Sequence, residues 1–358
     1  MGRVTLQTIA DQLGVSRMTV SNAFSRPDQL SAELRARILG VAEQLGYVGP
    51  DPAARALASG TAGNVGLLLS DTLAFALRDH VATAFLSSIA EELAPTGRAL
   101  TLLTSMTPEE IVPARDVAMD GAFVYSCIPD SASVKWLIRR GLPLVFVDQD
   151  PARGHPSVNI DDRGGAQAAA RHLVELGHRR VAVVTTGFGG RFGQLDDPLT
   201  AAGAHTERER ITGWLAGLDG SGVEPTVLRL PHGDPAATGE EAGNRLFAAR
   251  RRPTAVLCFS DAVASGVLRA AGAAGLSVPA DVSVVGFDDS PLALELRPRL
   301  TTVHQDVTRK GRAAAAALTG AIEAARAGTT KRPRRIVLPT ELVARESTAP
   351  PPGRRPTA

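Results

Sequence analysis

Residues 5–25 carry the pattern that most constrains the fold of this chain. Apolar residues at positions 6, 9, 10 and 13 recur with the i, i+3, i+4, i+7 spacing of one buried helix face, and Thr5 precedes them as an N-cap. Gly14 ends this helix, because glycine readily adopts the left-handed conformation of a helix C-terminus. Ser16 is placed to cap a second helix whose positions 20, 23 and 24 face inward. The spacing predicts two short helices joined by a tight turn.

The outer face of the second helix is mostly polar and begins at the N-terminal end of the helix. Its predicted members are Arg17, Met18, Ser21, Asn22 and Ser25. In helix-turn-helix domains, a short second helix presents its N-terminal residues to base edges in the major groove. A small amphipathic hairpin shares the same periodicity, but the specific spacing favours a DNA-reading motif.

Two further helical segments follow. Ser31 is the expected N-cap of a third helix that runs to Leu45 and stops at Gly46, which completes a three-helix headpiece over residues 1–48. Residues 51–60 then begin with an Asp cap and a Pro at the first helical position and end on Gly, as expected for a helix of about two turns. Nucleation costs more than so few backbone bonds return, so we expect this helix to form only against a partner.

The sequence resembles the LacI/GalR family of bacterial transcriptional regulators from Val4 to about Glu346. The matching motifs are Val4-Thr5-Leu6, Gly14-Val15-Ser16, Thr19-Val20-Ser21, Leu45-Gly46-Tyr47 and Ala54-Arg55-Ala56-Leu57. The resemblance implies a sequence-specific DNA-binding regulator, usually a repressor. It also implies a homodimer that binds near-palindromic operator DNA under the control of a small-molecule effector, a sugar or a related metabolite.

The resemblance assigns roles in the headpiece and in a hinge over residues 49–61. Arg17 suits guanine, Asn22 suits adenine, and the apolar Met18 suits a thymine methyl group. The implied phosphate contacts are Thr5, Ser16, Thr19, Ser21 and Tyr47, and the implied hinge contacts are Arg55 and Leu57. Two copies of Leu57 would wedge between the central base steps and kink the duplex.

Composition adds little evidence for DNA binding, and it excludes several other classes. Residues 1–60 hold six arginines against five acids, and the 358-residue chain has a formal net charge of +2. We expect two or three domains, a cytoplasmic location without a signal region, and no membrane helix. The isolated Cys127 and Cys258 indicate buried free thiols. The seven histidines never pair at metal-ligand spacing, so no metal or cofactor is expected.

From residue 64 the pattern changes to short apolar strands that alternate with helices. The runs typical of buried parallel strands occupy residues 65–69, 99–103, 122–125, 144–147, 181–185, 255–259 and 282–285. The βαβα order repeats on both sides of a junction near residues 159–164, and strands at 302–305 and 336–338 are expected to return across it. The fold class is therefore an all-α helix-turn-helix headpiece plus an α/β domain of two doubly wound lobes.

The resemblance describes the α/β domain as periplasmic-binding-protein-like, over residues 62–346. The expected N-lobe comprises about residues 62–161 and 293–325. The expected C-lobe comprises about residues 162–292 and 326–346. Residues 347–358, rich in Pro and Arg, are expected to form a disordered tail.

Ligands of open parallel sheets bind beyond the carboxyl ends of the strands, so polar residues that follow strands are candidate contacts. The resemblance assigns Asp288 to the effector as the first acid of a Gly-aromatic-Asp-Asp motif, and Arg210 through an R-x-x-G motif, with Arg208 as a competing register. The other expected effector contacts are Asp71, Phe75, Asp148, Ser260 and Gln305. Ser260 stands where many relatives carry Asn, and for Asp261 we favour a helix-capping role.

Other features favour structural explanations. The glycine-rich segment at residues 187–193 lacks phosphate-loop spacing and is expected to form a flexible pocket loop. Trp214 shares a helix face with Ile211 and Leu218, so we expect core packing. The sequence contains no nucleophile elbow, Walker loop or metal triad, which argues against an enzyme. A transport-binding protein would share the lobes but would lack the headpiece.

Overall fold

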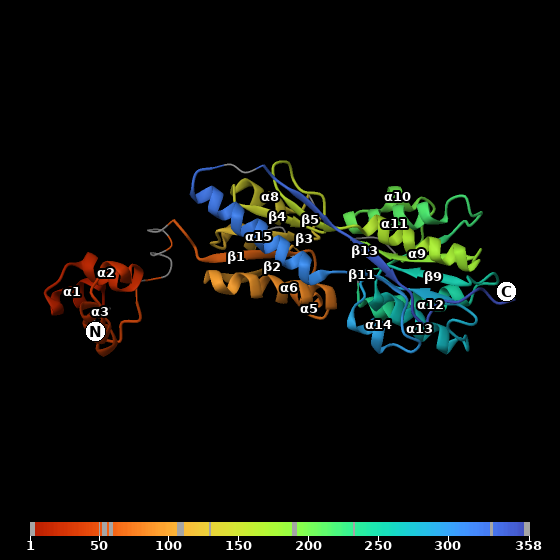
Figure 1. The fold of residues 1–358 in the computed structure, drawn as a ribbon, viewed down its shortest axis with the longest axis horizontal. Coiled ribbons are helices and arrows are strands. Elements are labelled where there is room, and N and C mark those ends of the chain that lie inside the picture. The colour runs from red at the N-terminus through yellow and green to blue at the C-terminus, as the bar shows by residue number, and fades with distance from the viewer. Residues whose placement is uncertain are drawn as a thin grey trace. The chain divides into compact units, whose positions relative to one another are not determined.

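The computed structural model describes residues 4–49, 51, 56, 60–105, 111–128, 130–187, 192–231, 233–329 and 332–353. The chain forms two compact units, Met1–Gly63 and Asn64–Ala358 (Figure 1). Each unit has a hydrophobic core of its own.

The first unit contains the three predicted helices, α1 (Leu6–Leu13), α2 (Arg17–Ser25) and α3 (Ala32–Gln44), with a 3₁₀ turn, η1 (Pro27–Gln29), before α3. Thr5 caps α1 in a capping box with Thr8, and Gly14 ends the helix in the left-handed conformation, at φ +66°. The backbone N–H of Thr19 donates to the Ser16 hydroxyl at 3.0 Å and so caps α2. The expected helix ends are confirmed. They could be predicted because local capping residues determine where each helix begins and ends.

One small core holds the three helices together. Its fully or almost fully buried members are Ile9, Ala10, Val20, Ala23, Ile38 and Ala42. The rings of Phe24 and Tyr47 meet edge to face, with centroids 5.7 Å apart, so the segment after α3 is anchored on α2. The predicted hinge contacts Arg55 and Leu57 lie outside the described residues.

The second unit begins with a six-stranded parallel sheet that forms the N-lobe. Its order is β12 (Arg335–Leu338), β5 (Ser157–Ile160), β4 (Leu144–Val147), β3 (Gly121–Tyr125), β1 (Asn64–Leu69) and β2 (Ala99–Thr104). The helical segments of this lobe are α5 (Leu73–Ala76), α6 (His80–Leu93), η2 (Ala94–Thr96), α7 (Pro113–Asp116), α8 (Ala132–Arg139) and α15 (Val307–Arg326). Apolar side chains of α6 and α15 pack on the sheet.

The C-lobe is built on a five-stranded sheet of order β10 (Ser283–Val285), β9 (Ala255–Cys258), β6 (Val181–Thr186), β8 (Thr226–Leu230) and β7 (Gly193–Gln194). Only β7 runs antiparallel to its neighbour in this described sheet. The helices are α9 (Asp162–Leu176), α10 (Pro198–Ala201), α11 (His205–Leu218), α12 (Pro235–Phe247), α13 (Asp261–Ala273) and α14 (Pro291–Glu295). β11 (Thr302–Gln305) pairs antiparallel with β13 (Thr340–Val343).

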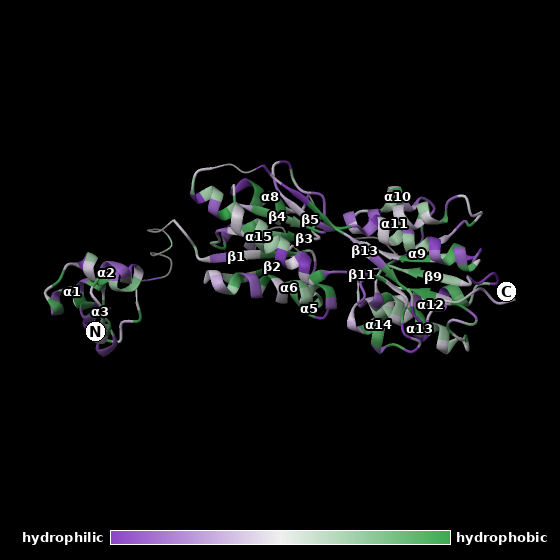
Figure 2. Cartoon of the chain, viewed as in Figure 1, coloured by the Kyte–Doolittle hydropathy of each residue, from purple (hydrophilic) through white to green (hydrophobic). Residues whose placement is uncertain are grey.

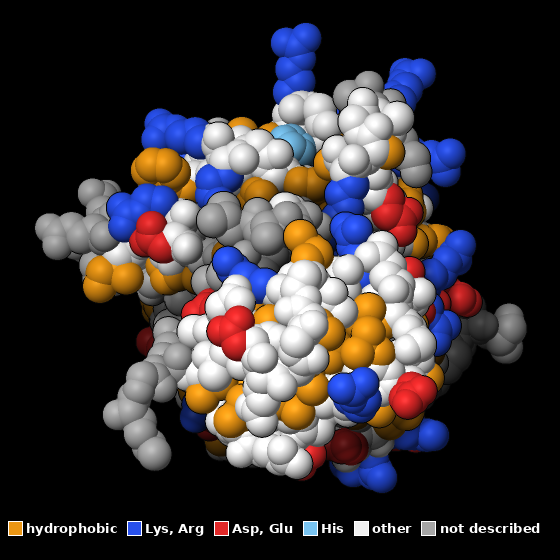
Figure 3. Space-filling view, turned by 90° about the vertical axis from the view of Figure 1, so that its left-hand side faces the viewer, with side chains coloured by type: hydrophobic (Ala, Val, Ile, Leu, Met, Phe, Trp, Pro, Cys, Tyr) orange, Lys and Arg blue, Asp and Glu red, His pale blue; other side chains and the backbone are white. Residues whose placement is uncertain are grey.

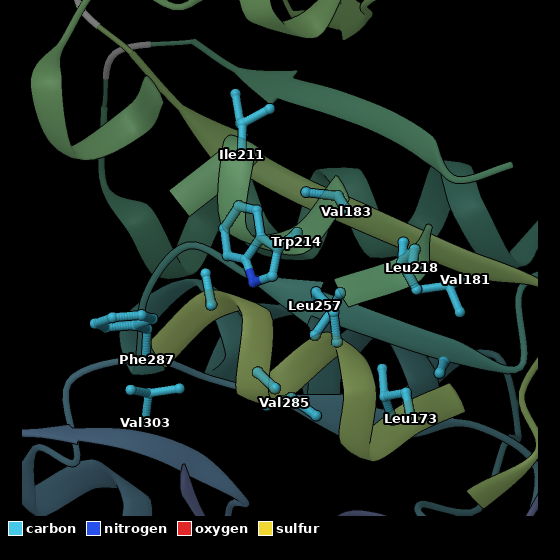
Figure 4. Close-up of a cluster of buried hydrophobic side chains, with 14 of the residues drawn as sticks. Leu173, Val181, Val183, Ile211, Trp214, Leu218, Leu257, Val285, Phe287 and Val303 are labelled. Atoms are coloured by element: carbon cyan, nitrogen blue, oxygen red, sulfur yellow. The ribbon is translucent and has the colours of Figure 1, made fainter. Parts of the chain in front are cut away.

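Hydrophobic residues concentrate where the pattern predicts them, on strands such as β4 and β9, with hydrophilic residues on the surrounding helices and loops (Figure 2). Trp214 lies at the centre of one C-lobe cluster, near Ile211, Val183, Leu257 and Phe287 (Figure 4). It is 1% exposed, which confirms the core role expected for it. Both cysteines are buried free thiols, as predicted.

The expected lobe boundaries are wrong for two segments. Residues 293–305, expected in the N-lobe, belong to the C-lobe, because Ala293 and Leu300 are buried in a C-lobe cluster and Val303 in another. Residues 326–338, expected in the C-lobe, include β12, which pairs in parallel with β5 of the N-lobe sheet. The chain therefore crosses between the lobes three times, next to Asp161, Asp306 and Pro339.

The expectation of a disordered tail is wrong for its first residues. The Ser347 hydroxyl donates to the Val284 carbonyl at 2.6 Å, and Ser347 is fully buried. The Ala349 N–H donates to the Ser283 hydroxyl at 3.1 Å. Because the backbone N–H of Val284 also donates to the Ser347 carbonyl, residues 347–349 are hydrogen-bonded to strand β10. Residues 354–358 lie outside the described residues.

Candidate functional site

The exposed face of α2 carries the predicted base-reading residues. Arg17 is exposed, and Met18 is 68% exposed although it is apolar, so neither takes part in the core of the headpiece. Asn22 is half-buried, and its side-chain amide donates to the Gln29 side chain at 3.1 Å. This bond orients the amide from the side of η1. The arrangement is that of a helix able to contact base edges with its N-terminal turns.

The predicted phosphate contacts lie around the same helix-turn-helix. Thr5 and Ser16 are exposed N-caps, whereas Tyr47 is half-buried against Phe24. Figure 3 shows Lys and Arg side chains dispersed over the face that it draws, without one continuous basic patch. The assignment of DNA binding therefore depends on the geometry of the helices rather than on charge.

All seven residues predicted to contact the effector line one cavity of about 200 Å³ between the lobes. They are Asp71, Phe75, Asp148, Arg210, Ser260, Asp288 and Gln305. Four of them follow a strand directly or within two or three residues, because the carboxyl ends of β1, β4, β9 and β10 point toward this cavity. The fold thus brings together residues that are as far apart as 71 and 305 in the sequence.

Arg210, on α11, is the cation in the cavity wall. Its Nε donates to Asp162 Oδ1 at 2.7 Å, another nitrogen lies 3.6 Å from Asp288 Oδ1, and Nη1 donates to the Phe259 carbonyl. The guanidinium also lies 3.6 Å from the ring centroid of Phe287. Hydrogen bonds along the edge of the planar guanidinium and the Phe287 ring against its face hold the group in a single orientation.

The competing register of the R-x-x-G motif does not reach the cavity. Arg208 donates to Asp150 Oδ2 at 2.7 Å, and its side chain is 40% exposed. The structure therefore places Arg210, and not Arg208, at the position that the motif predicts for the effector contact.

The backbone is strained where these side chains emerge. In the described part of the chain, the non-glycine residues with positive φ are Ser126, Asp148, Asp288 and Asp289, at +50°, +53°, +115° and +54°. The first three line the cavity. Such conformations persist only where the surrounding structure enforces them, and they concentrate at functional sites.

Burial raises the pKa of two acids, Asp288 in the cavity wall and Asp162 behind Arg210. Desolvation raises the pKa of Asp288 well above its ordinary value, although Arg210 opposes the shift. Desolvation also raises the pKa of Asp162, again against Arg210. Gln305 donates its amide to Asp288 Oδ1 at 2.7 Å, which gives this carboxyl a second fixed partner.

The capping role expected for Asp261 is wrong, because Ser260 is the N-cap of α13. The Val263 N–H donates to the Ser260 hydroxyl at 3.2 Å. The Asp261 carboxyl instead accepts the Ser290 N–H at 2.7 Å and the Thr302 hydroxyl at 2.5 Å. It therefore ties the start of α13 to the loop after β10 and to β11.

Sequence reasoning missed several residues of the site. Tyr125, Ser126 and Asp79 line the cavity, Asp162 supports Arg210, and Lys310 supports Asp148. A signal for Lys310 was available, because it shares a helical face with Ala314, Leu318 and Ile322, where a solvated lysine is out of place.

The described residues contain no group of three His, Cys, Asp or Glu side chains that could hold a metal ion. None of the described helices has the length and hydropathy that a membrane crossing requires.

A helix-turn-helix headpiece joined to a two-lobed domain, with a cavity lined by carboxyl groups and an arginine, defines a ligand-binding transcriptional regulator. Residues 5–49 match the family model for bacterial regulatory proteins of the lacI family, and residues 170–348 match the model for the periplasmic binding protein-like domain. The HTH-type transcriptional regulator IpsA of Corynebacterium glutamicum is 36% identical over 318 residues, which cover 86% of this chain and 88% of that protein. The chain belongs to the LacI family and is a DNA-binding transcriptional regulator.

Solved structures agree with this assignment. A LacI-family regulator from Corynebacterium glutamicum is 30% identical with a TM-score of 0.69, and the match covers 98% of this chain and 99% of that chain. The CelR–cellobiose complex is 27% identical with a TM-score of 0.68, and the match covers 96% of this chain and all of that one. The lac repressor dimer bound to operator has a TM-score of 0.77 at 24% identity, which supports the fold alone.

Proposed function

We propose that this regulator is a homodimeric, cytoplasmic repressor whose operator binding is controlled by an uncharged sugar or polyol in the cavity between the lobes. The observation that carries this proposal is the chemistry of the cavity wall. It combines carboxylates at strand ends with a cation, Arg210, that is already paired. The role is regulatory, and no catalytic step is proposed.

The cavity favours a ligand that donates hydrogen bonds. Asp71, Asp79, Asp148 and Asp288 line it, and among the described lining residues the one cation is Arg210, which is held by Asp162 and Asp288. A carboxyl group keeps acceptor capacity whether it is ionised or protonated, so hydroxyl groups of a ligand are suitable partners. An anionic ligand would meet carboxylates and no uncommitted cation among the described lining residues.

The apolar part of the wall fits the face of a sugar ring. Phe75 and Phe259 line the cavity together with aliphatic side chains such as Leu69 and Val81. The relative CelR is described in complex with cellobiose, and a LacI-family regulator from Enterococcus faecium with bound ribose. These ligands support a sugar as the effector class here.

For the operator, the proposal assigns base contacts to Arg17, Met18 and Asn22 and the central wedge to Leu57. Two headpieces related by a twofold axis require a near-palindromic site, and two hinge helices must pair at its centre. Effector binding closes the lobes and changes whether the hinge helices pair. By linkage, the effector and the operator change each other's affinity by the same factor.

The test combines footprinting of the full chain on the DNA upstream of its own gene with thermal-shift screening of neutral sugars. We expect protection of a near-palindromic site, and a sugar that raises Tm should change that protection. In Asp288→Ala the footprint without sugar should remain, while its response to the sugar is lost. A response at the same sugar concentration in Asp288→Ala would contradict the assignment of this residue.

A further inference from the structure

Lys310 is a buried cation that does not itself line the effector cavity. It lies near the start of α15, on the helix face that packs into the N-lobe, and its exposed fraction is 0%. Lysine is almost never fully buried unless it is paired, because removal of the ammonium group from water is strongly unfavourable. The role of Lys310 can therefore be inferred from the residues with which it pairs.

Both hydrogen-bond partners of Lys310 belong to the wall of the effector cavity. Its Nζ donates to Asp148 Oδ2 at 2.5 Å and to Gln305 Oε1 at 2.9 Å. It also lies 5.8 Å from the ring centroid of Tyr125, a third residue of that wall. Lys310 thus supports the wall from behind, at the point where the chain passes from β11 of the C-lobe into α15 of the N-lobe.

The second oxygen of Asp148 is evidence for a ligand contact. Asp148 is 6% exposed, and no donor among the described residues reaches its Oδ1. A buried carboxylate oxygen without a donor is unfavourable and rare in folded proteins. Because Asp148 lines the cavity, a hydroxyl group of a bound ligand can supply the missing donor.

Lys310 also fixes which way the Gln305 amide faces. An ammonium group has only donors, so it requires the Gln305 oxygen on its side. The Gln305 nitrogen is then turned to Asp288, to which it donates at 2.7 Å. One cation in the N-lobe therefore orients an acceptor in its own lobe and, through Gln305, a carboxyl of the C-lobe.

We propose that Lys310 is a positioning residue for effector recognition: it holds Asp148 and Gln305 so that the carboxyls of Asp148 and Asp288 present fixed acceptors to the hydroxyls of an uncharged polyol. This inference rests on the proposed function, because it requires that such a ligand occupies the cavity. Because Lys310 acts through Asp148, the effects of substitutions at the two positions on effector affinity should not add up.

The test is calorimetric titration of the full chain with ribose and with cellobiose, below the Tm of every variant. For a sugar that binds the unaltered chain, Lys310→Met should raise Kd by about 10- to 100-fold, the range for loss of a hydrogen bond to a charged group. Asp148→Asn should have a similar effect. The double variant should bind no more weakly than either single variant, because the residues act together.

The double variant also covers a failure of Lys310→Met to fold, since it leaves neither charge buried without a partner. Lys135→Met is the matched control, because the Lys135 side chain is 51% exposed and pairs with exposed Asp130 in the same lobe. A Kd within about twofold of the unaltered chain in Lys310→Met or in the double variant would overturn the inference, even with a lowered Tm. If the unaltered chain binds neither ribose nor cellobiose nor any neutral sugar of the thermal-shift screen, the proposed sugar effector is refuted and the inference is refuted with it.

Discussion

Replacement of Arg210 by methionine should destabilise the two-lobed unit far more than the same change at Arg208. Arg210 is 5% exposed and pairs with Asp162, which is 1% exposed, so its removal leaves a buried carboxyl without its cation. Removal of one partner of a buried ion pair costs about 3–5 kcal/mol. The Arg208 side chain is 40% exposed and pairs with Asp150, whose side chain is 61% exposed, so we expect about 0–1 kcal/mol there.

Protonation of Asp162 limits the loss of stability in Arg210→Met. Desolvation already raises the pKa of Asp162 in the presence of Arg210, and without the cation the carboxyl will take up a proton more readily. We therefore expect the lower end of the range, about 3 kcal/mol. At an entropy of unfolding of about 2.1 cal/mol/K per residue, this is a loss of roughly 5 °C in Tm for the unit Asn64–Ala358. A carboxyl with a raised pKa in the folded state destabilises more as pH rises, so the loss should be smaller in acid.

Differential scanning calorimetry of Arg210→Met, Arg208→Met and the double variant Arg210→Met/Asp162→Asn measures these effects. The double variant should recover part of the Tm, because no buried carboxylate is left without a partner. Equal values of Tm for the two single variants would refute the reasoning, and so would an Arg210→Met loss that grows as pH falls.

Three further outcomes are expected. Arg17→Ala should cost about 1–3 kcal/mol on the preferred operator and relax selectivity at one base pair per half-site, measured by fluorescence anisotropy; an equal loss on all sequences would indicate a phosphate contact. Leu57→Ala should weaken operator binding and reduce the DNA bend in gel-shift assays with varied central steps, and an unchanged bend would reject the wedge. Burial raises the pKa of Asp261 from 3.8 to about 6, so the folded chain keeps a proton that the unfolded chain loses, and this residue's contribution to stability falls as pH rises between these values. Asp261→Asn should remove that part of the slope in urea unfolding; identical slopes would exclude this assignment.

Local signals predicted the headpiece well, while the lobes depended on pairings that are distant in sequence. Thr5, Gly14 and Ser16 fix helix ends through bonds within three or four residues. Strand β8 was missed because Arg229 stands in it. A buried arginine is tolerated there because Glu207, 22 residues earlier, accepts its hydrogen bond at 2.8 Å and the Ala201 carbonyl accepts another. The lobe membership of β12 likewise depends on its pairing with β5, far away in the chain.

The candidate site divides in the same way. Acids that follow apolar strands, such as Asp148 and Asp288, could be found because topology brings strand ends together. Their supporting residues could not be assigned from spacing. Asp162 lies 48 residues from Arg210, and Lys310 lies 162 residues from Asp148, so only the folded chain shows that they are partners.

The three crossings between the lobes set an order of events during synthesis. The described core of the headpiece is formed by residues up to Tyr47, whereas the N-lobe sheet lacks its edge strand until β12 is made, and β11 lacks its partner until β13 is made. At ordinary synthesis rates the helix-turn-helix is complete roughly half a minute before the lobes. A chain interrupted before residue 335 therefore carries a finished DNA-reading unit without a finished regulatory domain.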